Sequence, residues 1–468
     1  MTIDAEFLAR IQFAFVVAFH ILLPAFTVGL ASYIAFLEGM RLATGDEKWL
    51  AISNFWIRIF SVSFAMGVVS GIVMPFQIGA NWSRFSDATG NISGPLLAYE
   101  GLTAFFLEAA FLGVLLFGRP LVPRWAHFFA ALMVALGTLF SSFWILSFNS
   151  WMQTPQGHEI IDGRFFPLSW TQIIFNPSFP YRIAHTVSAF YITTGFVVLG
   201  VAAWLMRKGK SPEAARSMFG VTLWFLTIMT PLQIVIGDLH GLNTREHQPA
   251  KLAAIEALWE TQARAPLTLF AIPDEANERN RFSVEIPVLG SLILGHAADA
   301  TIQGLKDFPP QDRPPVALPF FGFRLMVGIG MLMLFLVVVA NVARWRGVLF
   351  ESPRLLRVFE FAAPLGFVAV LAGWVVTEVG RQPWTVYGLL RRSESFTPSL
   401  TTLDVAISLT AFVVTYLIVY PAGVLVMARM VNQGPAHGAE TAPVEGGRPR
   451  SPVRAPAEAP VQDREGAR

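Results

Sequence analysis

Nine long apolar segments leave this chain few ways to fold. Each approaches the roughly 20 residues that a helix needs to span about 30 Å of hydrocarbon. The composition agrees, because 54% of the residues are hydrophobic and 14% are charged, whereas charged residues make up about 25% of a typical soluble protein. The sequence therefore predicts an all-α polytopic membrane protein with nine transmembrane helices. The predicted spans are residues 12–38, 55–80, 96–117, 126–148, 183–206, 218–239, 320–343, 358–379 and 403–428.

The first apolar segment lacks the marks of a removable signal peptide. It is too long, and neither a basic stretch before it nor a small-residue cleavage site after it is present. We therefore expect it to remain as the first transmembrane helix. The short loops set the orientation, since cytoplasmic loops carry the excess of Lys and Arg. These loops hold twelve such residues on one face and seven on the other, which predicts an outside N-terminus and a cytoplasmic C-terminus.

The spans and the polar segments divide the chain into four parts. Six helices precede the longest polar segment and three follow it, and a polar tail ends the chain. By the predicted orientation, the longest polar segment lies on the outer face. The four parts are residues 1–240 (helices 1–6), 241–318 (the long loop between helices 6 and 7), 319–430 (helices 7–9) and 431–468 (the tail).

Both polar segments have compositions that suggest their local structure. A loop as long as 241–318 is usually functional or disordered. Within it, His247 to Arg264 read as a helix with charges on one face, and the prolines between Phe308 and Leu318 predict an extended segment. The tail is rich in Pro, Ala, Gly, Glu and Arg, a composition that cannot bury a core. We expect the tail to be disordered and cytoplasmic.

The absence of cysteine from the sequence excludes several kinds of redox site. Without thiolates there are no cysteine-ligated iron–sulfur clusters, no covalently attached c-type haem and no disulfides. Redox chemistry would therefore use His, Met or Glu ligands. The formal net charge is +2, and the basic residues lie in short loops beside the spans. Nucleic acid is therefore not an expected partner.

Ionisable side chains inside the spans are few, and their cost in lipid makes them functional candidates. His185 and Met326 lie at a similar depth near the predicted outer face, counting about 1.5 Å of rise per residue. His and Met form an axial pair known for six-coordinate electron-transfer haem. His20 and Glu378 lack an obvious second protein ligand, which suits open-sided, oxygen-reactive iron. The candidates are His20, Glu100, Glu108, His185, Arg324, Met326, Glu378 and Arg381.

Simpler interpretations exist for the same residues. An intramembrane histidine such as His20 is often a helix contact, and a methionine such as Met326 is usually packing. Glu100 and Glu108 lie eight residues apart, about two turns and on neighbouring faces, so they suit a structural polar pair or a proton relay. A secondary transporter would use such carboxylates, but paired halves with matching broken helices are not evident. A copper-containing haem oxidase needs several clustered histidines, and the remaining ones find no ligand partner at a consistent depth: His127, His158, His240, His247 and His296.

Four short motifs establish a resemblance to a known family. They occur in the expected order and, taken together, are highly specific. The chain resembles subunit I of the cytochrome bd and cyanide-insensitive quinol oxidases, and the resemblance covers roughly residues 5–430. The motifs are YEGLTAFFLE at Tyr99–Glu108, KLAAIEALWET at Lys251–Thr261, FRLMVG at Phe323–Gly328 and GWVVTEVGRQPW at Gly373–Trp384.

The resemblance implies three haems. His185 and Met326 match the axial ligands of the low-spin haem b558. His20 and Glu378 match the ligands of the high-spin pair, haem b595 and either haem d or a third b-type haem, and we assign haem d to His20. Trp374 lies four residues before Glu378 on the same helix face, where an indole would assist electron transfer. Further haem contacts, including charge-assisted bonds to the propionates, are expected from Arg324, Arg381, Gln382 and Trp384.

The resemblance also implies quinol and proton sites. Lys251 and Glu256 match quinol residues in the long loop, which is called the Q-loop in this family. A cation and a carboxylate on a water-exposed loop would accept the proton released by an oxidised hydroquinone, although without the resemblance they would read as a solvated charged face. Glu100 matches a residue on the oxygen side of the haem at His20. Glu108 would precede Glu100 on the path of proton uptake.

The implied reaction is oxidation of quinol on the outer face coupled to reduction of dioxygen to water. Quinol protons would leave outside and the protons consumed would come from inside, so that charge separation builds a proton-motive force without a pump. The implied location is the bacterial cytoplasmic (inner) membrane. The implied partners are a second polytopic subunit (subunit II), a small single-span subunit, quinol, dioxygen and the lipid bilayer, with no nucleic acid.

Overall fold

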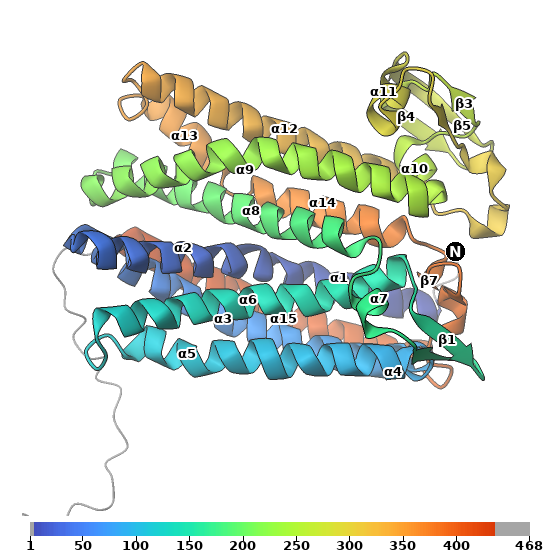
Figure 1. The fold of residues 1–468 in the computed structure, drawn as a ribbon, viewed down its shortest axis with the longest axis horizontal. Helices are drawn as coiled ribbons and strands as arrows, with labels where there is room; N and C mark the ends of the chain where they lie inside the picture. The colour runs from blue at the N-terminus through green and yellow to red at the C-terminus, as the bar shows by residue number, and fades with distance from the viewer. Residues whose placement is uncertain (1–3, 436–468) are drawn as a thin grey trace, which may run out of the picture.

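The computed structural model describes residues 4–435, and within them nine helices are long and apolar enough to cross a membrane. They lie along one common direction (Figure 1), which confirms the predicted all-α polytopic fold. The first three residues of the predicted tail, 431–433, belong to the last helix, which ends at Gln433. From residue 436 onward the tail lies outside the described residues.

Six of the nine spans are single helices and three are composite. The single helices are α3 (Glu47–Asn81), α6 (Arg124–Gln153), α8 (Phe179–Arg207), α9 (Pro212–His247), α12 (Ala317–Trp345) and α15 (Thr402–Gln433). The composite spans are α1 (Ala5–Leu22) with α2 (Pro24–Thr44), α4 (Ser83–Tyr99) with the π-helical turn η1 (Glu100–Phe105) and α5 (Phe106–Phe117), and α13 (Pro353–Ala362) with α14 (Leu365–Val379).

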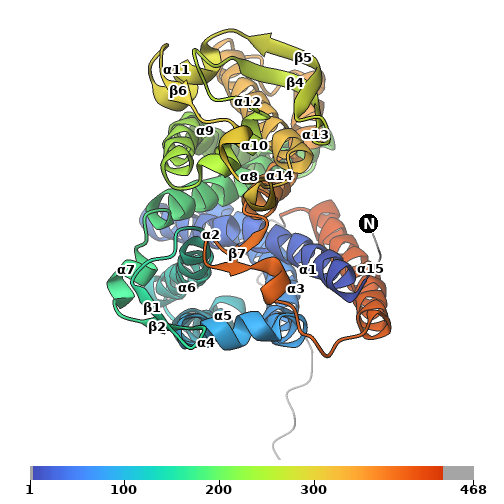
Figure 2. The same cartoon turned by 90° about the vertical axis from the view of Figure 1, so that its right-hand side faces the viewer.

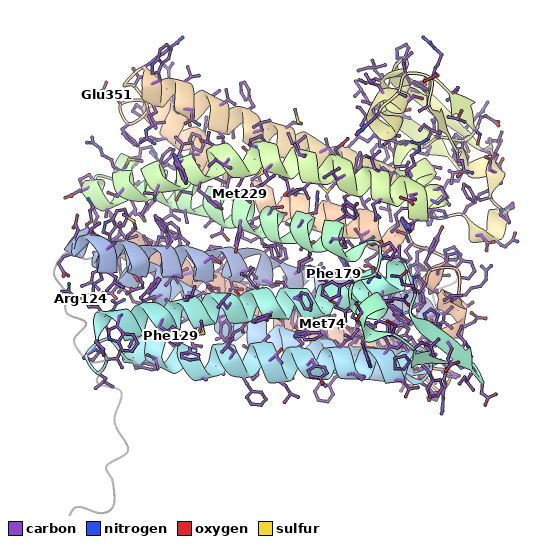
Figure 3. All side chains as sticks on the ribbon, in the orientation of Figure 1. Met74, Arg124, Phe129, Phe179, Met229 and Glu351 are labelled. Carbon is purple, nitrogen blue, oxygen red and sulfur yellow. The ribbon has the colours of Figure 1, made fainter. Side chains whose placement is uncertain are left out.

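The two ends of the bundle carry different kinds of connection. One end, here the loop end, carries the long segment between α9 and α12. The other, here the far end, carries short turns, and Figure 3 labels Arg124 and Glu351 there. The loops with the predicted cytoplasmic excess of Lys and Arg therefore share the far end. The loop end also carries a hairpin of β1 (His158–Ile161) and β2 (Arg164–Pro167), the short helix α7 (Trp170–Ile174), a hairpin of β7 (Trp384–Val386) and β8 (Leu390–Arg391), and a 3-10 turn, η4 (Arg392–Glu394).

Helix α8 lies at the centre of the bundle. It packs against α2, α6, α9, α13 and α14. In its most apolar stretch of 18 residues, 67% of the residues are buried within the chain. Viewed end-on, α9 and α12 lie on one side of it and α3 to α6 on the other (Figure 2). Helix α15 packs against α1 and α3 at the edge of the bundle, and only 11% of the residues in its most apolar stretch are buried. The apolar surface of α15 is therefore left for lipid or another chain.

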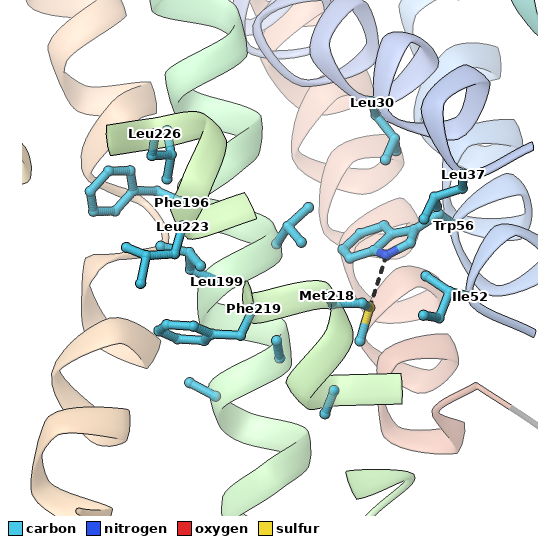
Figure 4. Packing of buried hydrophobic residues seen from close by; sticks show 14 of the residues in the cluster. Leu30, Leu37, Ile52, Trp56, Phe196, Leu199, Met218, Phe219, Leu223 and Leu226 are labelled. Atoms are coloured by element: carbon cyan, nitrogen blue, oxygen red, sulfur yellow. Dashed lines mark hydrogen bonds between the residues drawn. The ribbon is translucent and has the colours of Figure 1, made fainter. Parts of the chain in front are cut away.

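A buried apolar cluster joins the two sides of the bundle. The indole of Trp56 on α3 donates a hydrogen bond from Nε1 to Sδ of Met218 on α9 at 3.2 Å (Figure 4). Leu30, Phe196 and Phe219 are fully buried in the same cluster. Helices in lipid associate largely through such close packing, so this cluster fixes the frame that holds the interior side chains.

The start of the long loop differs from the sequence-based expectation. Helix α9 continues through His247, and α10 (Pro249–Glu256) ends where Ala257 adopts a left-handed φ of 50°. The predicted helix from His247 to Arg264 is therefore wrong beyond Glu256. A left-handed residue after the last turn is a common way for a helix to end, but this residue is usually glycine. Because alanine occupies the position here, no residue type marked the end of the helix.

The rest of the long loop contains strands that were not predicted. The segment Phe308–Leu318, expected to be extended, includes a 3-10 turn and the first two residues of α12. Prolines fix φ but also suit the first positions of helical turns. The loop elements are β3 (Gln262–Ala263), β4 (Leu267–Asp274), β5 (Arg279–Ile286), α11 (Leu289–Gly295), β6 (Thr301–Ile302), η2 (Leu305–Asp307) and η3 (Pro310–Asp312), with β4 paired to β5 and β3 to β6.

Three irregularities in the spans border one interior cavity. Pro24 has no N–H to continue α1, so the helix breaks one turn after His20. Pro75 interrupts the hydrogen bonds of α3, and the π-helical turn begins at Glu100. Pro24, Pro75 and Glu100 all line the cavity. Irregular backbone at membrane depth is tolerated where it faces protein or a cavity, and π turns inside α-helices occur frequently at functional sites.

Candidate functional site

The interior cavity has a volume of about 1470 Å³ and extends from the long loop into the middle of the bundle. It exceeds the roughly 300–1,000 Å³ of a typical small-molecule pocket. Of the thirteen residues that the sequence analysis expected to carry chemistry, eleven line it. These are His20, Glu100, Glu108, His185, Lys251, Glu256, Met326, Trp374, Glu378, Arg381 and Gln382.

His20 faces the cavity from the last turn of α1 in a defined tautomer. Its Nδ1 lies 3.0 Å from Oγ of Ser70. That hydroxyl has two carbonyl acceptors, Met66 O and Gly67 O, each at 3.1 Å. Assigning the hydroxyl hydrogen to one of these carbonyls makes Ser70 the acceptor of Nδ1–H from His20 and leaves a lone pair on Nε2. A neutral imidazole fixed through one nitrogen is the usual form of a histidine metal ligand.

His185 and Met326 line the same cavity from α8 and α12. Nδ1 of His185 is buried and finds no hydrogen-bond partner in the described part of the chain. The ring of His240, on α9, lies edge-on to it with the centroids 5.4 Å apart. Gly373, on α14, makes room for Met326, since a Cβ at this glycine would lie 2.7 Å from the methionine Sδ. The cavity thus presents an imidazole and a thioether as candidate axial ligands.

Glu378 is held at both carboxylate oxygens near the end of α14. Asn149 Nδ2 donates to Oε1 at 2.9 Å and Arg381 Nη2 donates to Oε2 at 2.5 Å. Gln382 Nε2 also donates to the main-chain carbonyl of Glu378 at 3.3 Å. Each carboxylate oxygen keeps a further acceptor site, so the group is positioned and still able to bind. Trp374 lines the cavity one turn earlier on α14, as its spacing suggested.

Arg324 and Trp384 do not line the cavity and contact protein groups instead. Arg324 donates from Nη2 to Oε2 of Glu256 at 2.8 Å and from Nε to the carbonyl of Thr268 at 3.0 Å. It therefore ties the long loop to α12. The guanidinium of Arg391 lies 4.3 Å from the ring centroid of Trp384. The haem contacts expected of Arg324 and Trp384 stay predictions.

Lys251 is buried on α10, not exposed on a loop surface as the sequence analysis assumed. Its Nζ donates to two glutamine side-chain oxygens, at 2.5 and 2.7 Å. Burial lowers the pKa of Lys251 well below its ordinary value. The nearby Arg182 and Arg381 cations lower this pKa further, whereas the carboxylate of Glu378 opposes the shift. Lys251 therefore interacts electrostatically with Arg182, Arg381 and Glu378, which also line the cavity.

Glu256 is also buried, at the end of α10. Its carboxylate pairs with Arg324 and lines the cavity beside the apolar side chains of Leu252, Ile255 and Leu294. A paired carboxylate next to an apolar wall suits a ligand with an apolar body and a hydroxyl group. Both proposed quinol residues therefore face the cavity from the loop end.

Glu100 and Glu108 are brought onto one face of their span by the π-helical turn. Eight residues on a regular α-helix would place them about 80° apart. The turn η1 uses i to i+5 hydrogen bonds and so absorbs one extra residue, which makes the pair equivalent to i and i+7. The expectation of neighbouring faces is therefore corrected to a shared face, and both carboxyls line the cavity.

Both carboxyls have close neighbours on α6. Ser141 Oγ donates to Oε1 of Glu100 at 2.8 Å. Glu108 is 6% exposed, and its side chain passes over Gly137, where a Cβ would lie 2.5 Å from Cγ of Glu108. Only a glycine leaves that space. Glu108 lies on the far-end side of Glu100 along the same span, as a proton path from that end requires.

The sequence analysis missed several polar residues of the cavity. Arg182 was excluded because the predicted span began one residue later, although it lies one turn before His185. His240 was left without a role because its neighbour across the helices was unknown. Ser141 is a polar residue within a predicted apolar span and Asn149 follows the end of that span directly, so both could have been considered from the sequence.

The remaining unassigned histidines lie away from these candidate ligands. His158 packs against Trp151 and Phe165, with ring centroids 5.5 and 5.1 Å away. Nδ1 of His247 lies 3.3 Å from the side chain of Asn243, and Nε2 of His296 lies 3.0 Å from Asp238. His127 pairs with Glu38 at the far end. Each of these rings therefore contacts another side chain of the protein.

The donor set of the cavity fits haem. His20 offers a free Nε2, His185 has a buried nitrogen without a partner within residues 4–435, and Met326 and Glu378 offer a thioether and a carboxylate. No group of three or more His, Cys, Asp or Glu side chains forms a metal site in the part of the chain that the structure covers. A porphyrin supplies most ligands of its iron, so one or two protein ligands per iron suffice.

Comparison with known proteins gives a consistent result. The family model described as cytochrome bd terminal oxidase subunit I matches residues 8–435. Cytochrome bd ubiquinol oxidase subunit 1 of Bacillus subtilis (strain 168) is 34% identical, with 92% of this chain and 94% of that protein covered. Cytochrome bd-II ubiquinol oxidase subunit 1 of Escherichia coli (strain K12) is 31% identical, covering 92% and 97%. The bd oxidase structure from Geobacillus thermodenitrificans matches with a TM-score of 0.85 and 30% identity, covering 92% of this chain and 99% of that one.

Proposed function

Because the chain belongs to the cytochrome bd terminal oxidase subunit I family, we propose that it is the haem-bearing subunit of a quinol:oxygen oxidoreductase that generates proton-motive force by charge separation. The chain is a multi-pass protein of the bacterial inner membrane, and its family implies haem cofactors. The observation that carries the proposal is one cavity that collects His20, His185, Met326 and Glu378. These are the side chains that the resemblance to the family assigns to iron, with Met326 and Glu378 lying in two of its motifs.

We assign each haem to its ligands as follows. His185 and Met326 hold the low-spin haem b558. Glu378 and His20 hold the high-spin pair, which is haem b595 and either haem d or a third b-type haem, with His20 on haem d. The free Nε2 of His20 and the positioned carboxylate of Glu378 support single-ligand binding. When bound, the haems supply one-electron transfer and dioxygen reduction, which protein side chains cannot perform.

Quinol binds where the long loop meets the cavity. Glu256 accepts a hydrogen bond from a quinol hydroxyl and then its proton, and the apolar residues beside it contact the ring. Lys251 lies close by on the same helix and stabilises the deprotonated, anionic form of the quinol as a hydrogen-bond donor. Trp374 lines the cavity, follows Gly373, which faces Met326, and lies one turn before Glu378 on α14. From this position it assists electron transfer between the two sites.

Protons for water formation enter from the far end. Glu108 receives them first and passes them to Glu100, which lies on the same face of the span. We place the far end in the cytoplasm and the loop end outside, in agreement with the distribution of Lys and Arg. Quinol oxidation then releases protons outside and oxygen reduction consumes them inside, so charge is separated without a pump.

The chain acts in a complex with other subunits. A second polytopic subunit (subunit II) and a small single-span subunit are the proposed partners. The weakly buried α15 supports a partner or lipid on that face, since large apolar surfaces mark lipid or protein contacts.

The purified complex in liposomes tests the proposal. With quinol as the sole reductant, we expect oxygen consumption, proton release on the loop side equal to the protons carried by quinol, and proton uptake on the far side. Additional proton release would indicate pumping and overturn the charge-separation account. Failure of the complex to consume oxygen with quinol would overturn the enzymatic proposal itself.

A further inference from the structure

Arg182 is a buried cation in the cavity that no motif singled out. It lies on α8 one turn before His185, is 5% exposed and lines the cavity. Its Nε is buried and has no hydrogen-bond partner within residues 4–435. Residues three apart on a helix share a face, so Arg182 and His185 are directed to the same part of the cavity.

Arg381 has similarly unmet donors. It is 6% exposed and uses Nη2 to bind Glu378, but its Nε and Nη1 find no partner among the described residues. Arg182 lies close enough to both Arg381 and Glu378 to interact with them electrostatically. Two buried guanidinium groups therefore share the one carboxylate of Glu378.

Lys251 adds a third basic group to this cluster. Burial lowers its pKa, and Arg182 and Arg381 lower it further, which is the response expected of an amine facing surplus positive charge. The acidic group that opposes this shift is Glu378, and the ring of His240 also faces the cluster. Around Arg182 there are therefore more basic groups than carboxylates.

Such a deficit identifies the chemistry of the missing ligand. A buried charge without a partner is costly, so buried cations are normally paired. Guanidinium groups bind carboxylates through two parallel hydrogen bonds. The free donors of Arg182 and Arg381 therefore suit a ligand with several carboxylate oxygens inside the cavity.

We propose that Arg182 and Arg381 together bind the propionate carboxylates of the haem held by His185, and that Arg182 raises the reduction potential of that haem. This inference rests on the proposed function, because it takes haem as the source of the carboxylates. Ferric haem carries one more positive charge than ferrous haem, so a nearby cation favours the reduced state. Removing the charge of Arg182 should therefore make the haem harder to reduce.

Redox titration of the low-spin haem in the purified holo-complex provides the first test. We expect Arg182→Gln to lower the midpoint potential by about 59 mV, which corresponds to a tenfold change in the one-electron equilibrium constant. Arg182→Lys should shift the potential by less than half as much. Arg41→Gln is a matched control, because Arg41 is also a buried arginine but lies at the far end of α2. An unchanged midpoint in Arg182→Gln, or an equal fall in Arg41→Gln, would overturn the inference.

Infrared spectroscopy identifies the source of the carboxylate. With ¹³C-labelled haem carboxyl groups, the reduced-minus-oxidised spectrum should contain isotope-sensitive bands that shift in both Arg182→Gln and Arg182→Lys. If Arg182→Gln fails to assemble, the bands of Arg182→Lys decide the question. Unshifted bands, together with a wild-type midpoint that changes when acetate replaces chloride, would show that a free anion occupies the site. A wild-type complex without haem would instead refute the proposed function.

Discussion

The two ends of the bundle each bury a cluster of charged side chains, and the clusters differ in how completely they are paired. At the far end, Glu38 of α2 is 2% exposed. Its carboxylate accepts a hydrogen bond from Arg119 Nη2 at 2.7 Å and lies 3.1 Å from Nδ1 of His127. Ser53 also donates to it, and the other ring nitrogen of His127 lies 3.1 Å from the carbonyl of Leu115.

At the loop end, by contrast, the charges of Arg182, Arg381 and Lys251 face one carboxylate, that of Glu378. Buried guanidinium nitrogens there have no partner within residues 4–435. The far-end cluster is the more completely paired of the two, although the buried Nε of Arg41 beside Glu38 also lacks a partner among the described residues. It borders packed helices, whereas the loop-end cluster borders the cavity. The difference indicates that the far-end cluster stabilises the fold and that the loop-end cluster is arranged for a ligand.

The largest effect is expected from Glu38→Ala. This change leaves Arg119 and His127 buried without their carboxylate, and breaking a buried pair costs about 3–5 kcal/mol. We expect a large fall in the thermal unfolding temperature of the complex, with the haem spectrum of the folded fraction unchanged. Unaltered thermal stability would show that the far-end cluster has no stabilising role.

Glu108→Gln tests the region between the two clusters. The amide keeps the shape of the side chain but cannot carry a proton, so we expect oxygen reduction to slow on the order of a hundredfold at the proton-consuming step. Flow-flash kinetics should show little change in earlier electron transfer. Glu47→Gln, at an exposed far-end carboxylate, is the control. Normal proton uptake in Glu108→Gln would mark Glu100 and Glu108 as a structural pair.

Lys251→Ala tests whether the loop-end cluster serves quinol. We expect quinol oxidation to fall roughly tenfold, comparable to the loss of one hydrogen bond to a charged group, with the haems bound and still reduced by dithionite. Glu256→Ala should behave similarly. Lys306→Ala removes a more exposed lysine from the same loop and should leave turnover unchanged. Wild-type quinol turnover in Lys251→Ala and Glu256→Ala would remove both residues from the site.

The smallest effect is expected from Asp87→Asn. Asp87 pairs with Arg164 at 2.8 Å, but both side chains are more than half exposed. Exposed ion pairs contribute about 0–1 kcal/mol, so the unfolding temperature should scarcely change. A loss as large as that of Glu38→Ala would mean that burial does not explain the contrast between the two kinds of pair.

The spans, and many of the polar residues that line the cavity, could be identified from the sequence because the membrane limits the alternatives. Only helices and closed barrels satisfy the backbone in lipid, so apolar segments translate directly into helices. Ionisable residues in those segments are rare, which singled out His20, His185 and Glu378. The family motifs then identified Met326, which composition alone would have left as packing.

Other features depend on contacts that no local pattern contains. The π-helical turn at Glu100 moves Glu108 onto its face, and nothing in the sequence there distinguishes it from a regular helix. Burial of Lys251 follows from a bond to Gln153, 98 residues away. Arg182 was missed because a charged residue lowers local hydropathy and so moved the predicted start of the span past it.

An optical spectrum of the purified complex tests the central claim most directly. With quinol as reductant, the reduced-minus-oxidised spectrum of the wild type should show a low-spin b-type haem. Met326→Leu keeps the volume but loses the sulfur ligand, so this signal should convert to a high-spin form. Met333→Leu, two turns further along α12 and also lining the cavity, should leave the signal intact. A low-spin spectrum unchanged in Met326→Leu, or a wild-type complex without haem bands, would contradict the account.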